Sequence, residues 1–220
     1  MQKTITIEIK KGEVLQIVAP ESREDGKKAQ QAYYQSVFPI AETLGYKRLA
    51  QMNVKQKVVS EYDPAALIFY SWPNKEAERW LYGHPKWPSL KASRPDAWSE
   101  LKIYTETVQK DLTLRFDPTK YYSVVVAWFN AENPGDYERY LDGIAPAVER
   151  FGGRFIYKMR NPSFEAHASA AIAPGQITFV EWDKPDGFQR VQKSDEYKKH
   201  SKYFGTGLER FEFYWLEPKV

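Results

Sequence analysis

Three histidines are the residues of this chain whose side chains could most directly act as general bases or metal ligands. They are His84, His167 and His200, in a chain of 220 residues that contains no cysteine. The missing cysteines exclude disulfides, thiolate metal sites and a thiol nucleophile. The chain also lacks an HExxH motif, a His-x-His pair, the GxSxG elbow and the glycine-rich phosphate loops of nucleotide-binding proteins. The sequence therefore predicts no metal site and leaves isolated side chains as candidates for acid–base chemistry.

The three histidines differ in their sequence surroundings. His84 precedes Pro85, which is typical of a surface or capping histidine. His167, in the segment FEAHASAA, is expected to be a solvated residue of a hairpin loop, from which it could also reach over a cavity opening. His200 lies in the basic stretch KKHSKYF, which is predicted to be helical. We take His200 and His167, together with Glu181, as the candidate catalytic residues.

Aromatic side chains are the second lead, because the chain contains 7 Trp, 15 Tyr and 12 Phe, or 15% aromatic residues. A subset of them could line a cavity for a flat, apolar ligand, with Glu181 or Arg160 as a polar contact. The candidate ligand-binding residues are Trp72, Trp182, Tyr70, Trp128 and Arg160, with Tyr104 and Tyr214 as further lining residues. The alternative is that these rings only pack the core, and the high aromatic content favours this interpretation.

An internal repeat indicates which elements position these residues. Tyr33, Pro39, Glu42 and Gly45 recur 107 residues later as Tyr140, Pro146, Glu149 and Gly152. Beyond a three-residue insertion the offset becomes 110, and Pro64, Phe69, Trp72 and Tyr104 match Pro174, Phe179, Trp182 and Tyr214. Apolar positions match over the same stretch, so we infer a duplication. The histidines do not match between the copies, which argues against a duplicated catalytic histidine.

Each copy is predicted to have the element order βαββαβ. In the first copy, residues 13–108, strands are expected at 14–19, 46–53, 65–72 and 101–108, with helices at 26–44 and 75–82. In the second copy, residues 121–220, strands are expected at 121–129, 154–159, 176–182 and 208–216, with helical segments at 134–151 and 185–203. Residues 109–120 are assigned as a linker, and residues 1–12 as an added edge strand that belongs to neither copy.

Prolines and an asparagine mark helix positions within these segments. Asn74 is expected to cap the helix 75–82. Pro134 is expected in the first turn of its helix. Pro39 and Pro146 lie inside helices, so each helix is expected to kink or to begin a new segment there.

The strands are apolar on both faces, which a single sheet covered by helices on one side does not explain. In the strand 65–72, Leu67 and Phe69 point to one face, while Ile68, Tyr70 and Trp72 point to the other. A second sheet from the other copy is the simplest cover for the extra apolar face. The predicted fold class is therefore α+β, with two tandem ferredoxin-like repeats whose antiparallel sheets pack as a barrel within one chain.

With this arrangement of strands and helices, the sequence resembles the dimeric α+β barrel superfamily, which includes antibiotic-biosynthesis-monooxygenase-like and EthD-like branches. The resemblance covers nearly the whole chain, and its most specific part is a strand that leads into a Ser-x-Glu-Tyr-like helix start. These residues are ITFVEW at 177–182 followed by Ser194-Asp195-Glu196-Tyr197, with IFYSW at 68–72 followed by His84-Pro85-Lys86-Trp87 in the first copy. Most members of the superfamily pair two separate chains.

The resemblance implies a cofactor-independent oxygenase, isomerase or cyclase that acts on a small aromatic or polyketide-like compound. Cofactor-free oxygenases of this group use Trp, Tyr, Asn and Arg side chains in their pockets. No cofactor is expected on this interpretation; the alternative is haem, which some members bind and for which His200 could supply the iron ligand. A non-catalytic small-molecule or haem-binding module, or a structural scaffold, is the competing function.

Composition limits the partners that we expect. A net charge of +3 with interspersed charges does not predict a nucleic-acid surface, and the third strands lack the basic-Gly-aromatic pattern of RNA-recognition motifs. The chain has no signal-peptide pattern and no run of about eighteen apolar residues that could cross a membrane. We therefore expect a soluble cytoplasmic protein, either a monomer with internal pairing or a homodimer, with a small aromatic ligand as its partner.

Overall fold

The computed structural model describes residues 3–168 and 171–219, so residues 1–2 and 220 of the predicted end segments lie outside it. In the N-terminal half, four strands accompany four helices: β2 (Val14–Ser22), α1 (Lys27–Thr43), β3 (Lys47–Val59), β4 (Ala66–Trp72), α2 (Lys75–Tyr82), α3 (Trp87–Ala92), α4 (Arg94–Ala97) and β5 (Trp98–Thr107). The C-terminal half contains β7 (Tyr121–Phe129), α5 (Asp136–Arg150), β8 (Gly153–Arg160), β9 (Ser163–Glu165), β10 (Gln176–Trp182), α6 (Gly187–Gln192), α7 (Asp195–Gly207) and β11 (Leu208–Pro218). Both halves therefore have the predicted βαββαβ framework.

The two halves also share their strand register. Met52 of β3 pairs with Leu67 of β4, and the matching residues of the second copy, Met159 and Ile177, pair in the same way. Ile17 pairs with Tyr104, and Val124 pairs with Tyr214. Residues that pair in the first half therefore correspond, at offsets of 107 and 110, to residues that pair in the second half. This agreement in backbone hydrogen bonding supports the internal repeat.

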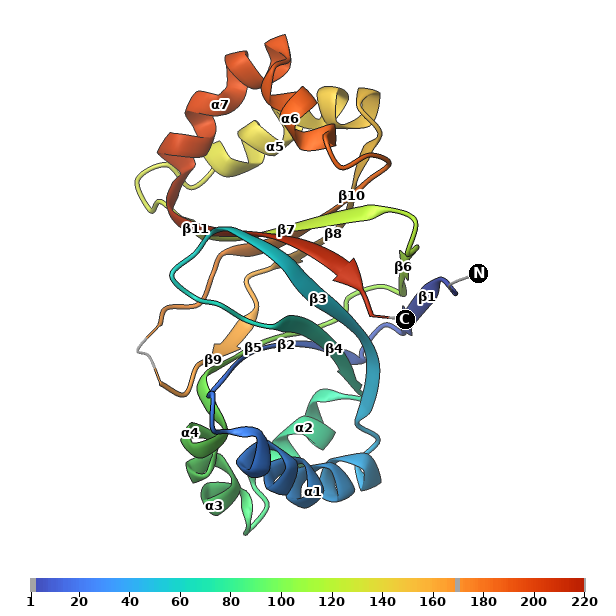
Figure 1. Ribbon diagram of the computed structural model, residues 1–220, viewed down its shortest axis with the longest axis vertical. Coiled ribbons are helices and arrows are strands. Elements are labelled where there is room, and N and C mark those ends of the chain that lie inside the picture. Colours follow the sequence, from blue (N-terminus) through green and yellow to red (C-terminus); the bar gives the residue numbers. More distant parts are fainter. Residues whose placement is uncertain (1–2, 169–170, 220) are drawn as a thin grey trace.

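The strands form one nine-stranded antiparallel sheet in the order β8-β10-β7-β11-β3-β4-β2-β5-β9. The halves join where β11 pairs with β3, and they join again where β9 pairs with β5. The order starts at β8 and ends at β9, and these two strands are consecutive in the chain, so the sheet curls round on itself. Figure 1 shows the resulting layers, with α5–α7 on one outer face, α1–α4 on the other and the curled sheet between them. The predicted intramolecular α+β barrel is thus confirmed.

Alternating side chains of the strands fill three separate layers. Phe69, Phe179, Tyr104 and Tyr214 belong to the large cluster inside the barrel. The neighbouring positions of the same strands, such as Trp72 and Trp182, pack outward against the helices of their own halves. The strands are apolar on both faces for the predicted reason: one face packs inside the barrel and the other packs against helices.

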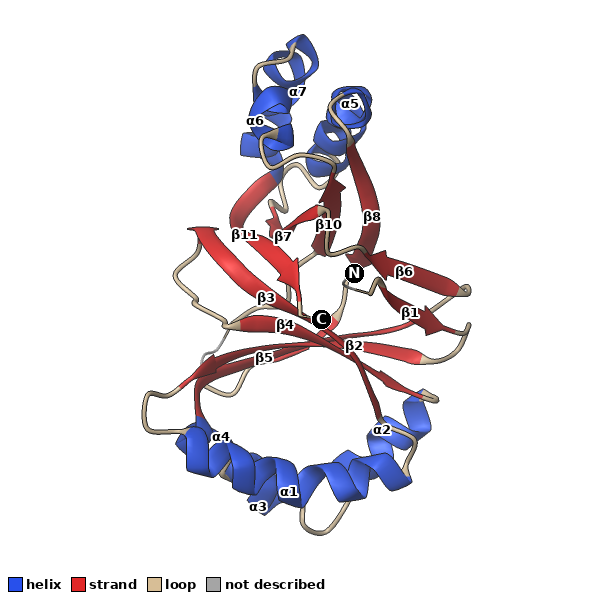
Figure 2. Ribbon diagram, turned by 45° about the vertical axis from the view of Figure 1, so that its right-hand side comes forward, coloured by secondary structure: helices blue, strands red, loops and turns tan. Residues whose placement is uncertain are grey.

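The N-terminal strand β1 (Ile5–Ile9) pairs with β6 (Leu112–Phe116), which lies inside the segment predicted as a linker. This two-stranded sheet is separate from the main sheet, so β1 is not an edge strand of either copy. Its apolar side chains Ile7, Ile9, Leu114 and Phe116 are buried in the barrel cluster. Figure 2 shows β1 and β6 together beside the main sheet. The pair therefore contributes to the barrel core.

Several predicted helix details differ from the structure. Pro134 lies before α5, which begins at Asp136, so it is not a residue of the first helical turn. Pro39 and Pro146 lie within α1 and α5 as predicted, and of the two expected effects, a new helical segment does not begin at either proline. The predicted segment 185–203 divides into α6 and α7, because Ser194 ends one segment and caps the next by accepting a hydrogen bond from the Tyr197 amide. The short helices α3 and α4 were not predicted.

Replacing Asn74 by alanine is expected to lower the free energy of unfolding by about 1 kcal/mol. The predicted cap is confirmed, since Asn74 Oδ1 accepts a hydrogen bond of 2.9 Å from the amide of Ala77. Urea denaturation of the wild type and the variant measures the difference. Asn74→Ser is the control, because serine can accept the same bond and should retain most of the stability; equal losses in both variants would argue against capping as the cause.

Candidate functional site

An apolar cavity lies in the C-terminal half, between the sheet and the helices α5–α7. This C-terminal cavity has a volume of about 370 Å³. Its floor is the outward face of β7, β10 and β11, and its walls come from α5, α6 and α7. The far end of β3, from the N-terminal half, supplies Gln56, Val58 and Val59 to its rim. A volume of this size is in the range of ligand pockets.

The lining of the C-terminal cavity is mainly aromatic. Its rings are Tyr137, Tyr140, Phe155, Trp182, Phe188, Tyr197, Phe204, Phe211, Phe213 and Trp215. The polar lining residues are Gln56, Ser123, Thr178, Gln189 and Gln192, besides the tyrosine hydroxyls. No Asp, Glu, Lys, Arg or His belongs to this lining within the described part of the chain. The cavity therefore suits a flat, uncharged ligand with a few hydrogen-bonding groups.

Two tyrosines and one tryptophan provide the oriented polar groups of this cavity. The Trp182 indole donates a 2.9 Å hydrogen bond to Ser123 Oγ, which fixes the ring on the sheet. Burial raises the pKa of Tyr137 and of Tyr140, so both hydroxyls stay protonated near neutral pH. Protonated hydroxyls can donate hydrogen bonds to a ligand carbonyl, but they are weak bases.

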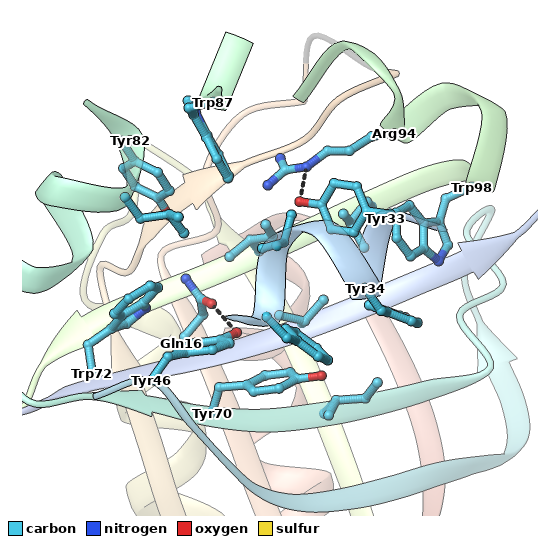
Figure 3. A pocket seen from close by; sticks show the side chains of 17 residues that line it. Gln16, Tyr33, Tyr34, Tyr46, Tyr70, Trp72, Tyr82, Trp87, Arg94 and Trp98 are labelled. Carbon is cyan, nitrogen blue, oxygen red and sulfur yellow. Dashed lines mark hydrogen bonds between the residues drawn. The ribbon is translucent and has the colours of Figure 1, made fainter. Parts of the chain in front are cut away.

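The matching space of the N-terminal half is much smaller. This N-terminal pocket, drawn in Figure 3, has a volume of about 60 Å³. Its occupants are its own aromatic rings: Tyr46 stacks on Tyr70 with centroids 4.8 Å apart, and lies 4.3 Å from Trp72. The two copies thus keep the same location for a pocket and fill it to different extents.

Aligned positions explain the difference in volume. Five bulky residues of the first copy correspond to smaller ones in the second: Tyr34 to Leu141, Phe38 to Ala145, Tyr46 to Gly153, Tyr70 to Val180 and Trp98 to Leu208. Leu101 and Ile103 change in the opposite direction, to Phe211 and Phe213, but by smaller amounts. The net loss of side-chain volume opens the C-terminal cavity.

The N-terminal pocket contains a buried charge that its counterpart lacks. Arg94 is 2% exposed, and its Nε donates a 3.0 Å hydrogen bond to the hydroxyl of Tyr33. A second nitrogen of Arg94 lies 2.9 Å from Glu165, which β9 brings from the C-terminal half. Burial favours the neutral form, but Tyr33 and Glu165 hold the pKa of Arg94 above its ordinary value. In the second copy the position of Arg94 is Phe204.

The predicted ligand-binding residues divide between different places. Trp182 lines the C-terminal cavity, whereas Trp72 and Tyr70 line the N-terminal pocket. Trp128 points into the barrel, where its indole donates to the Ile172 carbonyl and Arg210 stacks on its ring at 3.9 Å. Arg160 is exposed and pairs with Glu138 at 2.8 Å. The structure therefore does not gather the five residues into one site.

The three predicted catalytic candidates line neither pocket. Glu181 faces the barrel side of β10, where it accepts a 3.1 Å hydrogen bond from Tyr122 and pairs with Arg154. The His167 side chain is only 4% exposed, and its Nε2 donates to the Trp98 carbonyl at 3.1 Å. The expectation of a solvated loop histidine was therefore wrong, because the β9 hairpin folds His167 against β5.

His200 packs between helices. Its Nδ1 donates a 2.9 Å hydrogen bond to the Glu196 carbonyl, and its ring occupies the space beside Gly143 of α5. His200 is therefore not placed to hold haem iron in the C-terminal cavity, and the residues of that lining offer no histidine for this role. No group of three or more His, Cys, Asp or Glu suited to a metal ion occurs in residues 3–168 and 171–219.

Sequence reasoning missed most residues that shape the two pockets. Tyr140 was recognised only as a repeat marker that matches Tyr33, although both rings line pockets. Arg94, Phe204 and Ser123 belong to no recognisable sequence motif. A position-by-position comparison of the two copies could have found them, since each differs sharply from its counterpart.

Comparison with known proteins agrees with the barrel fold. An anthrone oxidase-like protein superposes with a TM-score of 0.58 and 11% sequence identity, over 97% of this chain and 95% of the other. A candidate monooxygenase from Fusobacterium nucleatum superposes with a TM-score of 0.51 and 13% identity, over 94% and 92% of the two chains. No protein-family model and no curated protein matches the sequence. The chain therefore has the α+β barrel fold of these two solved structures, with both halves in one polypeptide.

None of the helices in the described residues is both long enough and apolar enough to cross a membrane.

Proposed function

We propose that this protein binds a flat, uncharged aromatic or polyketide-like compound in the C-terminal cavity and oxidises it with molecular oxygen without a cofactor. One observation carries the proposal: an aromatic-lined cavity of about 370 Å³ without a charged side chain in its described lining. Burying an ion there would cost several kcal/mol, so the cavity favours neutral ligands. The likeness to an anthrone oxidase-like protein is consistent with this choice, although at 11% identity it concerns the fold.

The proposed reaction uses the substrate itself as the reductant. In an anthrone, the methylene group opposite the carbonyl in the central ring loses two hydrogens and becomes a second carbonyl. One atom of the oxygen molecule enters the product, and the other leaves as water with the two hydrogens. The electrons therefore balance without a bound metal or flavin. Solvent at the rim takes up the proton that the methylene loses and returns a proton to the oxygen atom that leaves as water.

The residues of the cavity have separate roles in this proposal. Trp182 and Phe213, from β10 and β11, present aromatic surface to a flat ring system. The Tyr140 hydroxyl, whose pKa is raised by burial, donates a hydrogen bond to the substrate carbonyl and stabilises negative charge on that oxygen. Exclusion of bulk water strengthens this interaction.

Titration with a panel of anthrones and quinols is expected to raise the melting temperature and quench the tryptophan fluorescence. Oxygen consumption is expected for the anthrones, measured with an oxygen electrode under subdued light. Tyr140→Phe should lower the turnover rate about 10- to 100-fold with little change in affinity. Tyr33→Phe, at the matching position of the other half, is the control and should leave the rate unchanged. Absence of both binding and oxygen uptake would refute the proposal.

The described cavity lining offers no side chain that could act as a general base, and this observation favours a second candidate function, a non-catalytic binding module. The described lining contains no carboxylate, histidine or lysine that could take a proton from the substrate. On this alternative, the same titration shows binding without oxygen uptake, and Tyr140→Phe weakens affinity only.

A further inference from the structure

The N-terminal pocket combines a small volume with polar groups that the C-terminal cavity lacks. Arg94 and Tyr33 lie on one side of it, while Gln16, Tyr82 and Trp72 lie on the other (Figure 3). These residues come from α4, α1, β2, α2 and β4, so five elements converge on a space of about 60 Å³. That space is too small for the aromatic ligand proposed above, but it can hold a molecule of a few heavy atoms.

One donor in this pocket has no partner in the described structure. Trp72 is 2% exposed, and its indole Nε1 makes no hydrogen bond. Its counterpart Trp182 does have a partner, Ser123 Oγ. Ser123 corresponds to Gln16, whose Oε1 already accepts from the Tyr46 hydroxyl at 2.8 Å. A buried N–H without an acceptor is costly, so a bound acceptor at this point would stabilise the fold.

The charges around the pocket leave room for a negative group. Glu165 is shared by two cations, since Lys91 Nζ lies 2.8 Å and an Arg94 guanidinium nitrogen 2.9 Å from the same Oε1 atom. The Arg94 guanidinium also stacks on Trp87 at 5.0 Å, which holds it in place. The buried Glu78 pairs with Lys75 and accepts a 3.4 Å hydrogen bond from the hydroxyl of Tyr82, which lines the pocket. Three cations face two carboxylates in this set, and because Lys91 and Lys75 are partly exposed, at 51% and 36%, Arg94 is the positive charge that lines the pocket itself.

We infer that the N-terminal pocket binds a small planar oxyanion, of the size of formate, acetate or nitrate, between the Arg94 guanidinium and the Trp72 indole. The planar fork of arginine matches a planar oxyanion, and its nitrogens have more donors than Tyr33 and Glu165 use. The Trp72 N–H lines the same pocket without a partner and supplies a further donor to the anion. The neutral cavity and this charged pocket then serve different ligands in two halves with the same framework.

The test is a thermal-shift and calorimetric titration of the whole protein with sodium formate, acetate or nitrate at constant ionic strength, with sodium chloride as the balancing salt. A saturable rise in melting temperature is expected for the planar oxyanions and not for chloride. Glu165→Gln should tighten binding about tenfold, because it removes the carboxylate that competes for Arg94. Trp72→Phe keeps the packing of a ring and should weaken binding about tenfold, because it removes the Nε1 donor.

Arg94→Gln should abolish the saturable response, and Arg139→Gln, which changes an exposed arginine of the other half, should leave it intact. Arg94→Gln removes one of the cations that pair with the Glu165 carboxylate, so this variant could fail to fold. In that case the binding measurements on Glu165→Gln and Trp72→Phe test the inference. The inference is overturned if the wild type gives no saturable response, which would leave water as the occupant of the pocket. It is also overturned if both variants respond like the wild type.

Discussion

Replacing Lys102 by methionine is expected to lower the free energy of unfolding by about 3–5 kcal/mol. Lys102 Nζ lies 3.1 Å from Glu212 Oε1, and both side chains are only 6% exposed. The ammonium group also lies 4.0 Å from the centre of the Tyr62 ring. Removing one partner leaves the Glu212 carboxylate buried with less compensation, which is the costly case for an ion pair in a protein interior. Urea denaturation followed by tryptophan fluorescence measures the loss.

Two further variants separate the loss of the buried ion pair from the general effect of replacing a lysine by methionine. Lys55→Met breaks an exposed pair with Glu217 at 3.3 Å and should change stability by less than about 1 kcal/mol. The double variant Lys102→Met and Glu212→Leu should recover much of the stability, because no buried carboxylate is left without its partner. A Lys102→Met variant as stable as the Lys55→Met variant would show that the buried pair contributes nothing.

Replacing Val180 by tyrosine is expected to weaken binding of the aromatic ligand about 10- to 100-fold. Val180 lines the C-terminal cavity, and the first copy carries Tyr70 at the matching position. Tyr70 and its stacked neighbour Tyr46 fill the N-terminal pocket, so the same ring in the second copy should fill part of the space that the ligand needs. Fluorescence titration with the tightest ligand of the anthrone panel measures the change.

The reciprocal variant Tyr70→Val is the matched control. It removes a buried ring from the N-terminal pocket and should destabilise the fold by a few kcal/mol, while leaving affinity for the aromatic ligand unchanged. Equal losses of affinity in both variants would place the ligand outside the C-terminal cavity. An unchanged affinity in Val180→Tyr would have the same meaning.

The sequence alone predicted the framework closely, because strand and helix patterns are local. The strands 121–129 and 176–182 have the predicted bounds. Apolar residues alternate onto both faces of these strands, and this pattern correctly indicated that the strands of the other copy cover the second face. The extension of β3 to Val59 and the short strand β9 were missed, since their pairing partners lie in the opposite half and no local pattern reports them.

The site was less predictable, for two physical reasons. Side-chain parity shows that Trp128 and Val125 point to opposite faces of β7, but it does not say which face meets the helices. Trp128 was placed with the ligand-binding residues on aromatic character, and it lies inside the barrel. Pocket volume depends on differences between the copies, such as Tyr46 against Gly153, whereas the repeat was recognised from residues that the copies share.

The buried pair of Lys102 and Glu212 has a consequence for how such a barrel can evolve. The two residues occupy equivalent positions of the copies, at the offset of 110. In a symmetric dimer of identical chains, a residue near the two-fold axis meets itself, so a lysine there would face a lysine. Joining the halves in one polypeptide removes that constraint. It allows opposite charges to meet, and it allows one pocket to become polar and nearly filled while the other stays open and neutral.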